Sequence, residues 1–83
     1  MAEQKIGVVS MYFARISVAG VELSDTIHVG DTIHIKGHTT DVEQVVESMQ
    51  IEHDMVEEAR AGQSIGLKVI DRVRSGDQVY KAG

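Results

Sequence analysis

Three histidines lie close together in the chain, and histidine is the side chain that most often binds a metal. His28, His34 and His38 fall within eleven residues, with Asp31 between the first two. The spacing does not fix a shared face, because one histidine lies in a strand-like alternating run and the others lie before and after it. We therefore expect exposed histidines and neither a bound metal nor another cofactor.

A second polar cluster, Glu52-His53-Asp54, contains the residue types of general acid–base catalysis. Such catalysis needs an enclosed site with two groups within hydrogen-bond reach, and this cluster lies in the most polar part of the chain. The sequence has no serine in a nucleophile-elbow motif, no Cys and no G-x-x-x-x-G-K-[ST] loop. We expect a protein that is not an enzyme and does not bind GTP.

Four basic residues in the last third of the chain form the candidate binding surface: Arg60, Lys68, Arg72 and Arg74. They could contact RNA phosphates or an acidic protein, although any soluble β-domain also needs such charges on its surface. Two features weaken the RNA interpretation: the net charge is −5, and residues 41–58 contain seven acids and no Lys or Arg.

These residues must be positioned by a single small domain, because the chain has 83 residues. We expect a flexible tail over residues 1–4 and one domain over residues 5–83. The N-terminus lacks the layout of a signal peptide, no segment is long enough to span a membrane, and Cys is absent. A cytoplasmic protein without a membrane partner is therefore the expectation. The oligomeric state does not follow from the sequence.

Val and Ile dominate the apolar residues, which favours strands. Six segments with alternating or β-branched character predict strands, namely 5–13, 16–23, 32–36, 41–49, 63–70 and 78–81. Met55, Val56 and Ala59 have the spacing of one short helical face. Together these segments predict an all-β fold, a small closed antiparallel β-barrel of about six strands with one short helical turn.

The alternation also predicts which side chains are buried. In the first strand, Val9, Met11 and Phe13 should share one face. In the fifth, Gly66 lies opposite the apolar face and removes a side chain where another backbone or a partner comes close. The expected core consists of Ile6, Val8, Ile16, Val18, Ile33, Ile35, Val46, Ile65, Leu67, Val69 and Val79.

Two Gly-Asp pairs stand directly before alternating runs, Gly30-Asp31 in VGDTIHIKG and Gly76-Asp77 in SGDQVYKAG. Glycine can take the positive φ that many turns require, and Asp can accept a hydrogen bond from a nearby backbone N–H. We predict that these four residues shape tight turns that fix where the following strands begin.

The order of four segments resembles the second domain of the translational GTPases, such as elongation factor Tu. These segments are Val29–Ile33, Val46–Met49, Ala59–Val69 and Gly76–Val79. The resemblance implies a six-stranded β-barrel that contacts RNA, the ribosome or a translation factor. Similar barrels are also appended to unrelated enzymes, including collagenase-like peptidases, so the fold alone does not decide the function.

Two functions therefore stay open. The first is a non-catalytic translation-linked module that binds RNA, ribosome or a translation factor. The second is a protein-interaction module or accessory subunit of an unrelated enzyme. The acidic segment 41–58 favours the second function, because it would repel RNA, whereas the resemblance favours the first.

Overall fold

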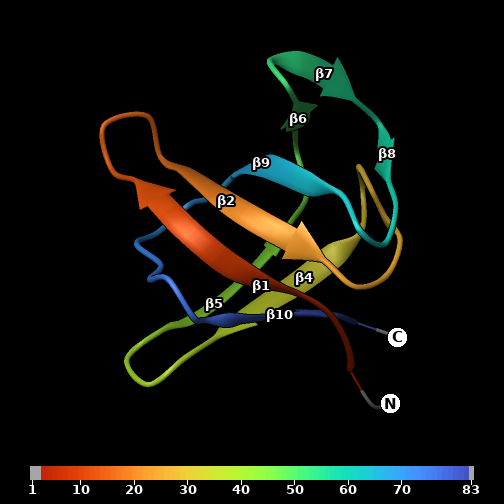
Figure 1. The fold of residues 1–83 in the computed structure, drawn as a ribbon. Coiled ribbons are helices and arrows are strands. Elements are labelled where there is room, and N and C mark those ends of the chain that lie inside the picture. Colours follow the sequence, from red (N-terminus) through yellow and green to blue (C-terminus); the bar gives the residue numbers. More distant parts are fainter. Residues whose placement is uncertain (1–2, 83) are drawn as a thin grey trace.

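The computed structural model describes residues 3–82, which form ten strands and, within that range, no helix (Figure 1). The strands are β1 (Gln4–Phe13), β2 (Val18–Leu23), β3 (Ile27–His28), β4 (Thr32–Lys36), β5 (Asp41–Val45), β6 (Met49–Ile51), β7 (Asp54–Val56), β8 (Glu58–Ala59), β9 (Ser64–Lys68) and β10 (Gln78–Lys81). Eight of them form one antiparallel sheet in the order β5-β4-β10-β1-β2-β9-β6-β7, and β3 pairs with β8. The all-β antiparallel prediction is confirmed.

The sheet curls into a half-barrel and does not close, so the prediction of a closed six-stranded barrel is wrong (Figure 1). Its two edges are β5 and β7. Strand β1, in the middle of the sheet, carries two register shifts, one between Lys5 and Gly7 against β10 and one between Val9 and Met11 against β2. Bulges increase the local twist and bend a strand, which explains why the sheet curls around β1.

The second bulge also changes which side chains of β1 face the core. Val9 pairs with Val21 and is buried, whereas Met11 pairs with Gly20 and lies on the outer face. One extra residue, Ser10, reverses the alternation, so Phe13 is also turned outward. The prediction that Val9, Met11 and Phe13 share one face is therefore wrong beyond residue 9.

The core lies on the concave side of the curled sheet. Most of the predicted core is buried: Ile6, Ile33, Ile35, Val46, Ile65, Leu67, Val69 and Val79. Three predicted members are wrong, because Val8 and Val18 are only half-buried and Ile16 is exposed. Strand β2 faces inward through Ala19, Val21 and Leu23, one residue out of register with the predicted face.

The predicted helical turn is wrong as well. Met55 and Val56 belong to β7, which pairs with β6, and Ala59 belongs to β8, which pairs with β3. The spacing that indicated a helical face arises because Val56 and Ala59 reach the core from two separate short strands. A few apolar residues at short range are compatible with either structure.

Both Gly-Asp pairs lie in turns of the same geometry. Gly30 has a φ of 98° and Gly76 a φ of 94°. The Asp31 carboxylate accepts the His28 N–H at 2.8 Å, and Asp77 accepts the Arg74 N–H at 2.8 Å. Residues 60–63 repeat the turn, with Gly62 at a φ of 89° and the Gln63 side chain accepting the Arg60 N–H at 2.7 Å.

The open side of the half-barrel is bridged by a buried amide. Gln44 of β5 donates a hydrogen bond to the Lys68 carbonyl at 2.8 Å and accepts one from the Ile70 N–H at 2.9 Å. It thereby links the edge strand β5 to the end of β9. It also gives hydrogen-bond partners to the Lys68 carbonyl and the Ile70 N–H, at a point where β9 has no strand on that side to provide them.

Strand β1 begins at Gln4, which pairs with Lys81 of β10. Residues 1–2 of the predicted tail lie outside the described residues, and the division into a tail and one domain stays a prediction. Within residues 3–82 there is no helix with the length and apolar character needed to cross a bilayer.

Candidate functional site

A groove crosses the convex face of the sheet over four neighbouring strands. It is open to solvent and has a volume of about 480 Å³, within the range typical of ligand sites. It is lined by Ser10, Met11, Phe13, Ile16, Val18, Gly20, Gln50, Glu52, His53, Ser64, Ile65 and Gly66.

The floor of the groove is a pair of glycines on adjacent strands. Gly20 of β2 lies directly opposite Gly66 of β9. Met11 flanks Gly20 on β1, and Gln50 flanks Gly66 on β6. Strands β1 and β6 are separated by three strand spacings, about 14 Å between their backbones. Ser10 Oγ and Met11 Cγ border the space over Gly20 closely, at 3.1 and 3.3 Å from where a Cβ would be, whereas over Gly66 the one atom within 4 Å of that position is Val18 Cγ1.

The fold does not require a glycine at position 66. Its φ lies outside the left-handed region, and a Cβ there would meet the Val18 Cγ1 atom at 3.4 Å, an ordinary van der Waals distance. Glycine in a strand interior weakens the strand, since it loses more entropy and packs no side chain. What Gly66 provides is therefore the open floor itself.

One wall of the groove is apolar and exposed. Met11, Phe13 and Ile16 keep 53%, 46% and 59% of their surfaces accessible, although each could be buried in a core. The bulge at Ser10 turns the first two outward, and Ile16 lies in the turn that joins β1 to β2. A contiguous apolar patch of this kind is typical of a binding surface.

The opposite wall is polar and carries backbone strain. Glu52 and His53 form the two-residue turn between β6 and β7, with φ values of 50° and 71°. Non-glycine residues at two consecutive positive φ values cost about 1–3 kcal/mol each. The remaining non-glycine residue with positive φ in residues 3–82 is Ser17, at 55°, between Ile16 and Val18, which both line the groove. The strained positions thus flank the groove.

A separate charge cluster lies around His34. Its Nδ1 is 2.9 Å from Glu3 Oε2, and its Nε2 is hydrogen bonded to Asp41. Lys36 binds the other oxygen of Glu3 at 3.1 Å and lies 5.6 Å from the centre of the Tyr80 ring. The cluster connects residues before β1 with the β4–β5 hairpin.

The partners in this cluster shift one another's pKa values. The hydrogen bond to Asp41 raises the pKa of His34 above its ordinary 6.5, and Glu3 adds to the effect. Lys36 and then His34 lower the pKa of Glu3, and His34 lowers that of Asp41. Glu3 in turn raises the pKa of Lys36. A ring whose two nitrogens both face carboxylates is stabilised in its charged form.

The same region could hold a metal only by rearranging. Glu3, His34 and Glu43 place ligand atoms within 4.8 Å of one another. Metal ligation requires a neutral imidazole with a free ring nitrogen, whereas both nitrogens of His34 face carboxylates. The arrangement favours an ionic cluster over a metal centre.

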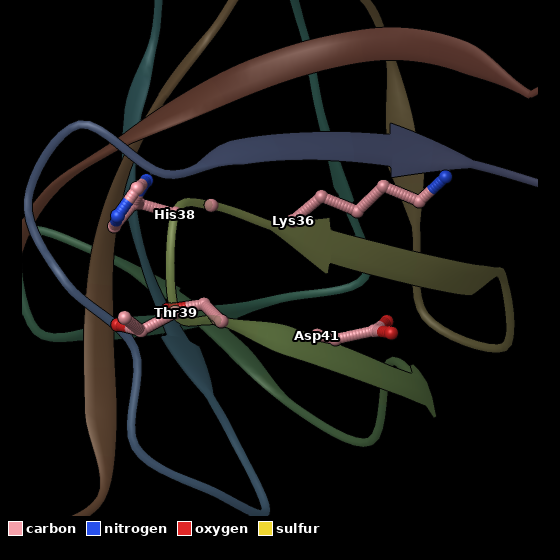
Figure 2. Close-up of a pocket in the computed structure, with 6 residues that line it drawn as sticks. Lys36, His38, Thr39 and Asp41 are labelled. Atoms are coloured by element: carbon pink, nitrogen blue, oxygen red, sulfur yellow. The ribbon is translucent and has the colours of Figure 1, made fainter.

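A shallow hollow of about 460 Å³ lies at the β4–β5 turn and is lined by residues 36–41 of that hairpin (Figure 2). His38 and Thr39 lie at the turn, whereas Lys36 and Asp41 extend away from it along the strands (Figure 2). Both of these charges are already engaged in the His34 cluster. The hollow therefore offers a ligand little that is not paired within the protein.

The three histidines do not converge, and the prediction that they are exposed is wrong for His34, whose side chain is 18% exposed. His28 approaches Asp31 and Glu58, at 3.7 and 3.6 Å, and shares no partner with His34. His38 lies at the β4–β5 turn. Glu52 and His53 do line a common surface, but as the rim of an open groove rather than as an enclosed acid–base pair.

The four predicted basic residues come from three segments of the chain. Arg60 precedes β9 and lies 3.7 Å from Glu58, whereas Lys68 ends β9 at the opposite end of the strand. Arg72 and Arg74 are exposed residues of the connection between β9 and β10, in which Val69, Val73 and Asp77 are buried. Their use in binding stays a prediction.

The sequence pattern indicates Gly66 as an open position, but the pairing of Gly66 with Gly20 and the apolar wall were not predicted. The wall depends on the bulge at Ser10, which leaves no local signal in a run of apolar residues. The available sign was Gly20 itself, a second glycine within a strand pattern.

The fold and the groove together define a small all-β domain with an open groove on its convex face. A scan against models of known protein families finds no match. The chain is 48% identical over 77 residues, 92% of its length, to an uncharacterized protease of Methanocaldococcus jannaschii, of which the match covers 19%. It is 43% identical over 72 residues to a collagenase of Porphyromonas gingivalis, covering 84% of this chain and 20% of that protein. The chain thus spans about a fifth of the length of these relatives.

The fold matches a solved domain of a similar protein. The C-terminal domain of a Geobacillus thermoleovorans protein described as a "putative U32 peptidase" superposes with a TM-score of 0.90 at 22% identity, covering 96% of this chain and 93% of that one. A selenomethionine variant of that domain gives a TM-score of 0.89, with 94% and 99% of the two chains covered. At this identity the likeness establishes the shared fold.

These comparisons overturn the resemblance to the translational GTPases, and with it the translation-factor function and the RNA or ribosome partner. The motifs that carried the resemblance have a structural cause. Gly30-Asp31 and Gly76-Asp77 form a turn in which Asp accepts an N–H from three residues earlier. Residues 60–63 form the same turn with Gly62-Gln63, so the turn favours a Gly-Asp pair without requiring it, and the pair does not identify a family.

Proposed function

We propose that this chain is a non-catalytic accessory domain of a peptidase and that it binds polypeptide through the groove on its convex face. The observation that carries the proposal is the groove itself, an open glycine floor between an exposed apolar wall and a strained polar wall. The likeness to part of two proteases and to a peptidase C-terminal domain supports the peptidase context.

The domain contributes binding and no bond cleavage in this proposal. The groove holds Glu52 and His53, but it is open to water and presents no nucleophile positioned by a base. Accessory binding of polypeptide raises the local concentration of substrate near a catalytic domain, which increases the rate without a new catalytic group. A cytoplasmic location stays a prediction.

A domain exchange in the Porphyromonas gingivalis collagenase tests the role. Deletion of the 72-residue segment that matches this chain should lower collagen hydrolysis at least about fivefold and leave cleavage of a short peptide nearly unchanged, because only long substrates use a remote binding site. Insertion of this chain should restore most of the collagen activity, whereas an unrelated β-domain of equal size should not. Unchanged collagen hydrolysis after deletion would refute the accessory role.

A further inference from the structure

We propose that the groove accepts an extended, basic polypeptide segment, with one apolar side chain seated on the Gly20–Gly66 floor. The inference rests on the proposed protein-binding role and adds the chemistry of the bound segment. It is carried by three features of the groove: the missing side chains of the floor, the apolar wall and the sign of the charge on the rim.

The glycine floor explains why a side chain of the bound segment would enter the groove. Gly20 and Gly66 place no side chain of their own between Met11 and Gln50, and the floor is most open at Gly66, where a Cβ would meet one atom, Val18 Cγ1 at 3.4 Å. The Ser10 hydroxyl bonds the Gly20 carbonyl at 3.2 Å at one side of this floor. An apolar side chain placed there would bury the exposed surfaces of Met11 and Phe13, which is the main gain available to a ligand.

The rim determines the charge of the segment. Glu52 carries the one carboxylate among the described residues that line the groove, and no Lys or Arg lines it. The polar wall belongs to the stretch 41–58, which contains seven acids and no basic side chain. A cationic group next to the inserted side chain would therefore meet a complementary potential.

The same charges disfavour a second copy of the chain as the occupant. Each copy has a net charge of −5 and would bring its own acidic rim to the contact. Like charges placed together across an interface oppose association. The complementary occupant is a cationic segment of another polypeptide.

The backbone strain at Glu52 and His53 is evidence that the rim of the groove has a function. Its two residues hold consecutive positive φ values at which Asn-Gly would be relaxed. The strained backbone directs both side chains to the rim of the groove, where they line it. Strain kept at such a position is typical of a functional site.

Titration of the nitrogen-15-labelled chain with the peptide GRGFGRG tests the inference by NMR. The amide signals of Gly20, Gly66 and Glu52 should shift with a Kd of about 1 mM or tighter. The analogues GRGAGRG and GEGFGEG should each bind at least about fivefold more weakly, because one lacks the apolar side chain and the other reverses the charge.

The variants Gly66→Val and Glu52→Gln test whether the peptide binds in the groove or elsewhere on the surface. Gly66→Val should fold with an unchanged or higher Tm and lose at least about tenfold in affinity. Glu52→Gln should bind both charged peptides about equally. Gln78→Val, which adds the same side chain to an exposed strand position outside the groove, should bind like the wild type. Gly66→Ala makes the same test as Gly66→Val with a smaller side chain on the floor.

Several results would overturn the inference. They are the absence of glycine amide shifts, equal binding of the basic and acidic peptides by the wild-type chain, and full affinity in folded Gly66→Val or Gly66→Ala. A concentration-dependent dimer that Gly66→Val abolishes would assign the groove to a second copy instead. If the peptide binds but the domain exchange fails, only the peptidase role is refuted. If the domain exchange succeeds but the peptide does not bind, only the proposed ligand of the groove is refuted.

Discussion

At the residue scale, the buried amide of Gln44 bridges the open side of the half-barrel. It is 8% exposed and serves the Lys68 carbonyl and the Ile70 N–H. Gln44→Leu should lower the free energy of unfolding by about 1–3 kcal/mol, because two partly buried hydrogen bonds, each contributing about 0.5–1.5 kcal/mol, are lost. Urea denaturation measures this loss. The exposed control Gln50→Leu should change stability by about 0.5 kcal/mol or less, and a similarly small effect at Gln44 would contradict the bridging role.

The His34 cluster should make stability depend on pH. The raised pKa of His34 contributes stability that is full below 6.5 and is lost as pH rises through the folded-state value. The lowered pKa values of Glu3 and Asp41 contribute above 4.5 and 3.8, and their contribution is lost as pH falls through the folded-state values. The cluster therefore stabilises the fold most between about pH 4.5 and 6.5.

Thermal unfolding of wild type and His34→Gln checks this dependence. Wild-type Tm should fall from pH 6 to pH 8, and His34→Gln should remove most of that fall, while His38→Gln should keep it. Titration of the His34 ring by NMR should give a midpoint above 6.5. A midpoint below that value would show that the carboxylates do not hold the ring charged in solution.

Some contacts between individual residues could be predicted from the sequence, because they join residues that are close together in the chain. The turn from His28 to Asp31 is closed by two local hydrogen bonds, His28 N–H to the Asp31 carboxylate and Asp31 N–H to the His28 carbonyl, so a four-residue motif contains both. The His34 cluster was not predictable, because Glu3 lies 31 residues from His34 in sequence and reaches it only through strand pairing. Such contacts depend on register, which no short motif encodes.

At the element scale, the β6–β7 hairpin keeps a turn that its residues disfavour. Replacing Glu52 and His53 by Asn and Gly should raise the free energy of unfolding by about 1–2 kcal/mol, because Asn-Gly adopts two positive φ values with little strain. Urea denaturation measures the gain. Glu47→Asn, a change in the same acidic stretch at a position without positive φ, should give no gain.

The double variant should also bind the basic peptide less well, since it removes the rim carboxylate. A more stable domain with weaker binding is the expected result if the turn is kept for function. A variant that gains stability and retains full binding would show that the strained turn serves no role in the groove.

The long strands were predictable from alternation, whereas the short ones were not. β4 alternates cleanly, with Ile33 and Ile35 buried, and its predicted bounds are those observed. β7 and β8 have three and two residues, too few for a period to be recognised. The bulge at Ser10 reversed the faces of β1 by adding one residue, and this error concealed the apolar wall of the groove.

At the scale of the whole molecule, an open sheet has edges that a closed barrel would not have. β7 is a three-residue edge strand, which offers little backbone for pairing, but β5 presents five residues. Its exposed side chains are Asp41, Glu43 and Val45, so two carboxylates accompany one apolar residue along that edge. Charged residues on an edge strand oppose pairing with a second chain.

Removal of one of these charges should therefore make the domain self-associate. Glu43→Val places two exposed valines on the β5 edge, and we expect concentration-dependent dimers or larger species at about 100 μM or above, measured by sedimentation velocity. Glu47→Val removes the same charge outside the strand and should stay in the wild-type state. Association of Glu43→Val should persist when Gly66→Val fills the groove, because pairing uses the β5 edge of the sheet whereas groove binding uses its convex face. Dimers that disappear on filling the groove would instead place the self-association site on the convex face.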